Sequence, residues 1–227
     1  DHRDLHSFPT RRSSDLASRG YALHVDWLNS LTTPEDIAFA RFIESPIAHP
    51  SVMFRREFVG QHGGYSDGEF PEDYELWLRW MAAGVRFGRI DAPVLRWNDP
   101  HGRLSRTDPR YSTDAFYTVK ARYLAKWLER ENIHHPEVIV WGSGRNTRLR
   151  VQPLQAQGVE VLAWVDVDPR KVDREIHGLP VISPDEIPEP GRCFIIPYVG
   201  TRPARDQIRT WLERQGHRLG KDFIPAA

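Results

Sequence analysis

Two adjacent carboxylates, Glu72 and Asp73, open a segment whose residue pattern predicts a helix. Pro71 suits the start of that helix, acidic side chains suit the positive end of the helix dipole, and Gly84 suits the helix end. Two interpretations follow from this pattern. The carboxylates stabilise the helix terminus, or one of them acts as a general base toward a bound hydroxyl group.

The helical segment is apolar almost all the way round, which is typical of a buried helix. Its polar exceptions, Glu75 and Arg79, are four residues apart and predict an ion pair on a narrow, solvated stripe. We therefore expect the two carboxylates to lie at the edge of a hydrophobic core. The apolar members of the segment are Tyr74, Leu76, Trp77, Leu78, Trp80, Met81 and Ala83.

The composition is that of an ordinary globular chain without net charge. The 227 residues include 31 basic and 31 acidic side chains, so no overall field attracts nucleic acid or an anionic membrane. The single cysteine, Cys193, excludes an internal disulfide and a cysteine-rich zinc site. No apolar run approaches the roughly 20 residues that span a bilayer, and we expect a cytoplasmic location.

Three sequence blocks, in a fixed order, resemble the C-terminal half of a family 2 glycosyltransferase. They are HPSVMFRR at 49–56, GGY at 63–65 and EDYELWLR at 72–79, and the likeness covers residues 17–112. In that family the fold is the GT-A nucleotide-sugar domain, and the Asp of the Glu-Asp pair is the usual candidate base of an inverting displacement. The resemblance implies that Asp73, beside Glu72, deprotonates an acceptor hydroxyl that attacks a nucleotide-diphosphate sugar.

The resemblance also implies where the substrates bind. Paired glycines let a backbone turn sharply or approach a ligand closely, and they equally suit an ordinary helix end. The segment 98–107 resembles the family's late loop over the diphosphate, where arginines would stabilise a leaving anion, although a solvated basic loop has the same composition. The substrate-binding candidates are His49, Gly63, Gly64, Trp77, His101, Arg103, Ser105 and Arg106.

The family binds its nucleotide and a divalent metal, Mg²⁺ or Mn²⁺, in the N-terminal half of the domain through an Asp-x-Asp motif. Residues 17–112 match the other half, so we expect no metal-ligating residues in this chain and no sugar transfer by the chain alone. Asp166-Val167-Asp168 has the right letters but lies far downstream, and we interpret it as unrelated. Residues 1–16 lack any helical or strand period, resemble a translated sequencing adapter and predict a non-native or disordered leader.

The C-terminal part predicts a second domain at 133–227, reached through a connecting helix at 113–132. A buried strand, a glycine turn, a helix, a second strand and an acidic residue follow in the order of a Rossmann-type dinucleotide unit. Its cofactor-binding candidates are Gly142, Gly144 and Asp166. Thr147 replaces the third glycine and Pro153 lies inside the predicted helix, so a docking domain without chemistry is the competing interpretation.

Together these patterns predict an α/β protein. A truncated GT-A-type domain at 17–112 precedes a small, Rossmann-like, three-layer α/β domain. The predicted function is inverting glycosyl transfer, with a nucleotide-sugar donor and a hydroxyl acceptor as partners. A nucleotide- or dinucleotide-binding module and a non-catalytic docking domain are the alternatives.

Overall fold

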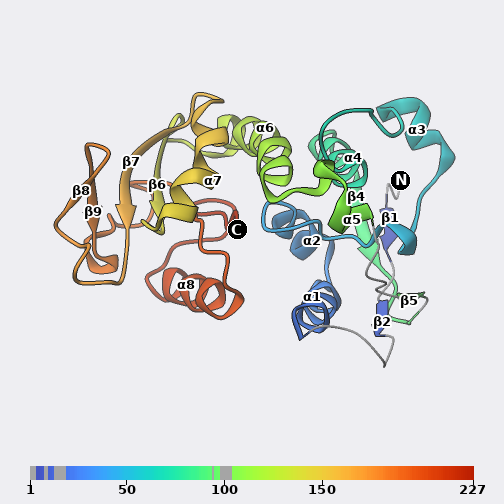
Figure 1. The fold of residues 1–227 in the computed structure, drawn as a ribbon, viewed down its shortest axis with the longest axis horizontal. Helices are drawn as coiled ribbons and strands as arrows, with labels where there is room; N and C mark the ends of the chain where they lie inside the picture. The colour runs from blue at the N-terminus through green and yellow to red at the C-terminus, as the bar shows by residue number, and fades with distance from the viewer. Residues whose placement is uncertain (1–3, 8–9, 13–18, 94, 98–103) are drawn as a thin grey trace. The chain divides into compact units, whose positions relative to one another are not determined.

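The computed structural model describes residues 4–7, 10–12, 19–93, 95–97 and 104–227. The chain forms two compact units, residues 1–119 and 120–227, and the boundary between them lies within helix α6 (Thr113–Glu131). Each unit combines strands and helices (Figure 1). The predicted α/β fold class is therefore confirmed.

Strands in the first unit form two small sheets. β1 (Asp4–Ser7) lies between β3 (Val52–Met53), to which it is antiparallel, and β4 (Arg86–Arg89), to which it is parallel. β2 (Thr10–Arg12) pairs in parallel with β5 (Leu95–Trp97). Two strands thus come from the leader segment, whose side chains show no strand period, because a backbone ladder needs only N–H and C=O groups.

One helix of the first unit, α2 (Pro34–Ala40), begins at a side-chain cap. Thr33 caps α2 in a capping box, since its hydroxyl accepts from the Asp36 N–H and the Asp36 carboxylate accepts from the Thr33 N–H, both at 3.0 Å. Residues 104–107, at the end of the predicted late loop, form a short helix. The helices are α1 (Arg19–Ser30), α2 (Pro34–Ala40), α3 (Arg56–His62), α4 (Glu72–Ala82) and α5 (Leu104–Thr107), with short 3₁₀ turns η1 (His49–Ser51) and η2 (Pro109–Tyr111).

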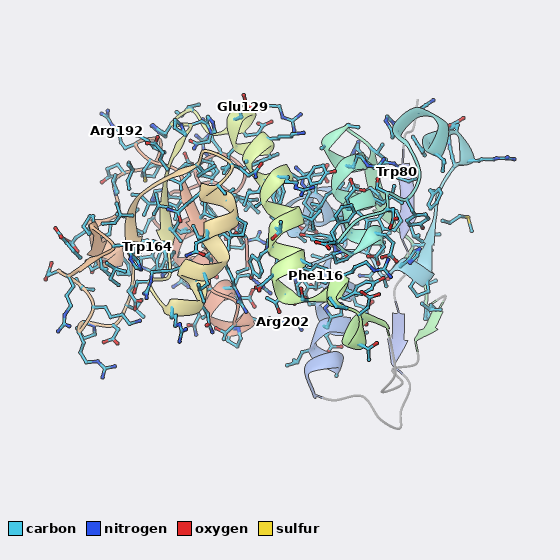
Figure 2. The ribbon with its side chains drawn as sticks, turned by 45° about the horizontal axis from the view of Figure 1, so that its top comes forward. Trp80, Phe116, Glu129, Trp164, Arg192 and Arg202 are labelled. Atoms are coloured by element: carbon cyan, nitrogen blue, oxygen red, sulfur yellow. The ribbon has the colours of Figure 1, made fainter. Side chains whose placement is uncertain are left out.

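Helix α4 forms the centre of the first unit's core. Trp77 and Trp80 are both fully buried, and α4 packs against apolar side chains of α2, α3 and β4. Their rings meet neighbours edge to face, with centroids 5.0 Å apart for Phe54–Trp80 and 5.6 Å apart for Trp77–Phe87. Trp80 lies among these side chains in Figure 2. The prediction of a buried helix at this segment is confirmed.

The polar stripe of α4 is buried, which corrects the expectation of a solvated ion pair. The Glu75 side chain is 8% exposed, and its carboxylate accepts from Arg79 Nε at 3.0 Å. Arg79 Nη2 donates to the Gly64 carbonyl at 2.6 Å, and Nη1 donates to the His62 carbonyl. A guanidinium carries five donors in a fixed fork, so this one side chain joins the helix to the glycine turn.

The second unit is built on a five-stranded sheet with the order β10-β6-β7-β9-β8. Its first four members run parallel, and β8 pairs with β9 as an antiparallel edge. Counted along the chain, the parallel strands lie in the order third, second, first, fourth, as in half of a Rossmann fold. The strands are β6 (Glu137–Trp141), β7 (Glu160–Val165), β8 (Glu175–Ile176), β9 (Leu179–Ile182) and β10 (Ile195–Pro197).

Helices α7 and α8 pack their apolar side chains in the core of this unit. α8 (Arg202–Arg214) packs Ile208 and Leu212 with Ile139 of β6. α7 (Arg145–Gln155) follows β6, buries Val151 and Leu154, and lies across the sheet in Figure 1. Apolar side chains on the strands thus define the fold of this unit.

Removing one half of the buried ion pair in α4 should strongly destabilise the first unit. Arg79→Met removes the guanidinium that pairs with the buried Glu75 carboxylate and donates to the His62 and Gly64 carbonyls, so we expect a loss of about 3 kcal/mol in unfolding free energy. The matched control is Arg209→Met in α8. Its i,i+4 pair with Glu213 is half exposed and contributes under about 1 kcal/mol.

Urea unfolding followed by circular dichroism measures both losses. Combining Glu75→Leu with Arg79→Met removes both charges, and we expect this double variant to recover part of the stability. Equal losses for the Arg79 and Arg209 variants would show that the contacts of Arg79 with Glu75 and the glycine turn add no special stability.

Candidate active site

Asp73 lies in the first turn of α4, after the N-cap residue Pro71. Its Oδ1 accepts from the Tyr74 N–H at 2.7 Å, while Oδ2 has no hydrogen-bond partner among the described residues. Burial raises the pKa of the Asp73 carboxyl, and the charge of Glu72 adds to that rise, although the Tyr74 hydrogen bond and His49 oppose it. A carboxylate with a raised pKa and an open oxygen is suited to accept a proton.

Glu72 is engaged by a tyrosine that the sequence analysis missed. The Tyr111 hydroxyl lies 2.7 Å from each carboxylate oxygen of Glu72. Burial raises the pKa of Tyr111, and the hydrogen bond to Glu72 raises it further, so the phenol stays protonated and donates. The two adjacent carboxylates therefore differ: a side-chain donor holds Glu72, whereas Oδ2 of Asp73 is open. No local pattern links Tyr111 to Glu72, which is 39 residues away.

His49 and Tyr65 form a second pair beside Asp73. His49 Nε2 lies 2.7 Å from the Tyr65 hydroxyl, and the His49 ring meets the edge of Trp77 with centroids 6.2 Å apart. Asp73 and Trp77 are four residues apart and share a face of α4, so His49 lies on the side of the helix that carries Asp73. The predicted residues His49, Glu72 and Asp73 are thus brought together.

The glycine turn supports this pair structurally. Gly63 ends α3 with a φ of 79°, and a Cβ there would lie 3.0 Å from Arg79 Nη1. The Gly63 carbonyl accepts from Trp80 Nε1 at 3.0 Å. The close approach is therefore to side chains of α4, and Gly63 and Gly64 position the Tyr65 that follows them.

Other predicted substrate contacts have different outcomes. Trp77 is fully buried, so it supports His49 from the core and cannot face a ligand, which corrects that prediction. Ser105 is an exposed residue of α5. His101, Arg103 and the Arg106 side chain lie outside the described residues, and their assignment stays a prediction.

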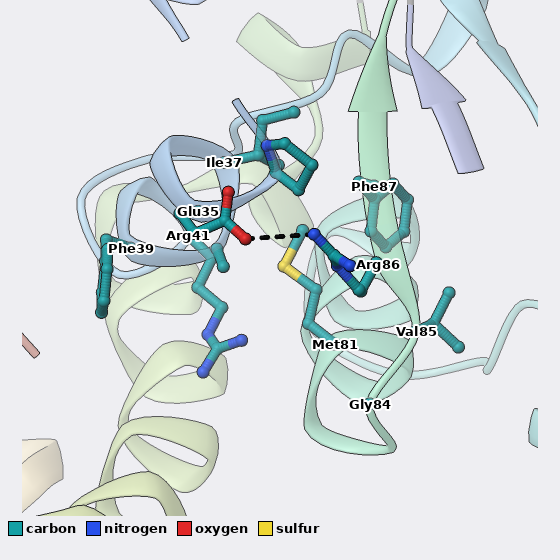
Figure 3. A pocket seen from close by; sticks show the side chains of 11 residues that line it. Glu35, Ile37, Phe39, Arg41, Met81, Gly84, Val85, Arg86 and Phe87 are labelled. Atoms are coloured by element: carbon teal, nitrogen blue, oxygen red, sulfur yellow. Dashed lines mark hydrogen bonds and ion pairs between the residues drawn. The ribbon is translucent and has the colours of Figure 1, made fainter. Parts of the chain in front are cut away.

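A pocket of about 190 Å³ lies elsewhere in the first unit (Figure 3). Met81 and Gly84 line it at the C-terminal end of α4, and Glu35 and Arg86 pair beside it at 3.1 Å. Asp73 is at the opposite end of the same helix. The pocket therefore does not serve the carboxylate chemistry.

The glycine turn of the second unit is fastened to Asp166. The Ser143 hydroxyl donates to the Asp166 carboxylate, and Lys171 Nζ donates to it at 2.8 Å. The Asp166 side chain is 11% exposed. Burial alone would raise the pKa of Asp166, but the Lys171 and Ser143 hydrogen bonds outweigh it and hold that pKa below its usual range.

Two features of this arrangement bear on a bound dinucleotide. A Cβ on Gly142, the first glycine of the turn, would lie 3.0 Å from Thr147 Oγ1 and 3.2 Å from Val199 Cγ2, whereas a Cβ on Gly144, the glycine at which a pyrophosphate would approach, meets nothing within 4 Å. Asp166 is committed to Ser143 and Lys171 and is not open to a ribose hydroxyl. Gly144 adopts an ordinary extended conformation at the N-cap of α7. Cofactor binding at Gly142, Gly144 and Asp166 stays a prediction, and the hydrogen bonds that already engage Asp166 oppose it.

The described part of the chain offers neither a cluster of metal ligands nor a long apolar helix. In that part no three His, Cys, Asp or Glu side chains gather as a metal site would require. No helix there combines the length and apolarity needed to cross a membrane.

Comparisons with known proteins support a relationship to glycosyltransferases. WbnJ of Escherichia coli, an O-antigen biosynthesis glycosyltransferase, is 28% identical to this chain over 88 residues. The matched segment is 38% of this chain and 33% of WbnJ, so the chain spans about a third of the length of the curated relative it matches. No family model and no solved structure matches the chain.

Asp73 and Asp166 should affect stability in opposite directions. Because the folded-state pKa of Asp73 lies above its unfolded value, its charge is unfavourable at neutral pH, and Asp73→Asn should raise the melting temperature. The pKa of Asp166 is lowered, so its charge stabilises above the unfolded pKa, and Asp166→Asn should cost about 2 kcal/mol at pH 7.

Calorimetry across a pH series tests this pair of variants. Both differences from the wild type should shrink on acidification: that of Asp73→Asn as pH falls through the raised pKa, and that of Asp166→Asn as pH falls below the unfolded value of about 4. Hydrogen exchange assigns each change to its own unit. A shift of the same sign in both variants would refute the assigned environments.

The engagement of Asp166 by Ser143 and Lys171 predicts no dinucleotide binding by the second unit. NADH or NADPH titrated into the chain should give no saturable fluorescence change up to about 1 mM. Asp166→Asn is the control, because a genuine ribose contact would be weakened by it. Saturable binding that this substitution abolishes would show that Asp166 is available to a ribose hydroxyl and would overturn the prediction.

Proposed function

We propose that this chain contributes the acceptor side of an inverting glycosyltransferase of the GT-A, family 2 type, with Asp73 as the general base. The observation that carries the proposal is the partly buried Asp73 carboxyl, which combines a raised pKa with an oxygen left open among the described residues. The three sequence blocks and the similarity to WbnJ supply the reaction class.

The proposed step is a single displacement. Asp73 Oδ2 takes the proton of the acceptor hydroxyl, and the acceptor oxygen forms a bond to the anomeric carbon of the nucleotide-diphosphate sugar. The bond from that carbon to the diphosphate oxygen breaks, and the diphosphate leaves with the electron pair. Attack opposite to the leaving group inverts the anomeric configuration.

Glu72 acts on Asp73 through charge. Held by Tyr111, it keeps a negative group beside Asp73, which favours the protonated form of Asp73 and so strengthens it as a base. The family resemblance implies Mg²⁺ or Mn²⁺ at the diphosphate, with Arg103 and Arg106 as candidate anion donors. The described residues supply no group of ligands for such an ion.

For the second unit we propose a supporting or docking role without dinucleotide chemistry. The hydrogen bonds that Ser143 and Lys171 donate to Asp166 favour this role, because they occupy the carboxylate that would contact a ribose. The sheet order of a Rossmann half-unit does not require the ligand, because function depends on the loops that the fold carries.

The base assignment is tested by transfer kinetics. We expect Asp73→Asn to lower the transfer rate about a hundredfold or more, since general-base catalysis contributes at least that factor. Glu72→Gln should lower the rate less and shift the acidic limb of the pH–rate profile downward, because Asp73 loses a neighbouring charge.

The assay measures release of nucleoside diphosphate from a panel of nucleotide sugars. It compares this chain with the same reading frame extended upstream, because the donor half is predicted to lie outside residues 17–112. Folded Asp73→Asn enzyme with an undiminished rate would eliminate Asp73 as the base.

A further inference from the structure

Tyr65 is an exposed aromatic residue beside a set of polar groups. Tyr65 is 49% exposed. The aromatic residues in the core around α4 are at most 3% exposed; they include Phe58, Trp77, Trp80 and Phe87. A singly exposed ring is ordinary on a protein surface, so exposure alone assigns Tyr65 no role. What distinguishes Tyr65 is that polar groups fix the position of its ring.

Tyr65 is also held in place from both ends. Its hydroxyl lies 2.7 Å from His49 Nε2, and the preceding Gly64 carbonyl accepts from Arg79 at 2.6 Å. The two rings of His49 and Tyr65 are 5.4 Å apart and inclined by 55°. An aromatic ring fixed in this way offers a preformed platform, and a ligand that covers it loses little binding energy to ordering the protein.

The groups near this ring define the chemistry of a ligand. Burial raises the pKa of Tyr65, and the charges of Asp73 and then Glu72 raise it further, so both carboxylates act on its hydroxyl. The surface thus combines one apolar ring face with a carboxylate oxygen, an imidazole and a phenol. Two neighbouring negative charges repel phosphates and other anions.

A neutral pyranose matches these features. It presents a face of C–H groups that packs on an aromatic ring, and hydroxyls at its edge that donate to carboxylates. An aliphatic alcohol would use the carboxylate but leave the ring uncovered. A nucleotide would cover the ring but bring phosphate charge toward Glu72 and Asp73.

We propose that the acceptor is a neutral carbohydrate whose pyranose ring stacks on Tyr65 and presents a hydroxyl to Asp73. The stacking itself follows from the exposed, anchored ring. The identity of this sugar as the acceptor rests on the proposed glycosyl transfer.

Saturation-transfer NMR on the purified chain tests the stacking. The probes are the methyl glycosides of glucose, galactose and N-acetylglucosamine, with glucose 6-phosphate as the anionic comparison. We expect saturation of ring C–H protons for at least one neutral glycoside and a much weaker signal for the phosphate. Tyr65→Ala and Tyr65→Leu should weaken binding at least about fivefold, whereas Tyr65→Phe, which keeps the ring, should retain it.

Leu162→Ala removes another exposed apolar side chain, in the second unit, and serves as the control for non-specific adsorption. Circular dichroism verifies that each variant is folded. Wild-type binding that Tyr65→Leu and Tyr65→Ala leave unchanged, or no binding of any neutral glycoside, overturns the proposal.

The outcome separates this inference from the proposed function. Glycoside binding that depends on Tyr65, combined with transfer that does not depend on Asp73, would retain the carbohydrate surface and reject the base. Transfer that depends on Asp73 but has the same KM for acceptor in Tyr65→Leu would retain the enzyme and reject the stacking.

Discussion

A single guanidinium fixes the geometry on which the first unit's candidate site depends. Arg79 is bound to Glu75 one turn earlier on α4 and donates to backbone carbonyls at His62 and Gly64. The turn therefore cannot shift along the helix without breaking charge-assisted hydrogen bonds in a partly buried setting. Tyr65 follows that turn directly, so the contacts of Arg79 fix its position relative to α4.

Three carboxylates show how environment divides one chemical group into different roles. Asp166 is hydrogen-bonded by Ser143 and Lys171 and stabilises a turn. Glu72 accepts from Tyr111 and remains a fixed charge. Asp73 accepts from the Tyr74 N–H, while burial raises its pKa. Only the last environment leaves a carboxylate with both the proton affinity and an open oxygen for proton transfer.

Patterns local in sequence predicted the elements well. The all-round apolar run predicted a buried α4, and the strand and glycine order predicted a Rossmann-like sheet. Interactions between residues far apart in the sequence could not be predicted from such patterns. The i,i+4 spacing of Glu75 and Arg79 is the same for a wet and a buried pair, and nothing near Glu72 indicates Tyr111. The spacing between the glycine turn and Asp166 likewise did not indicate the hydrogen bond from Lys171.

The two units differ in where they leave polar groups unsatisfied, and this difference separates scaffold from site. In the second unit the Asp166 carboxylate accepts from the Ser143 hydroxyl, the Ser143 N–H and Lys171, which stabilises the turn between β6 and α7. In the first unit an exposed ring and a carboxylate of raised pKa lie together. Both features cost stability when unliganded, and a bound acceptor would relieve both, which is the arrangement expected of a site selected for function.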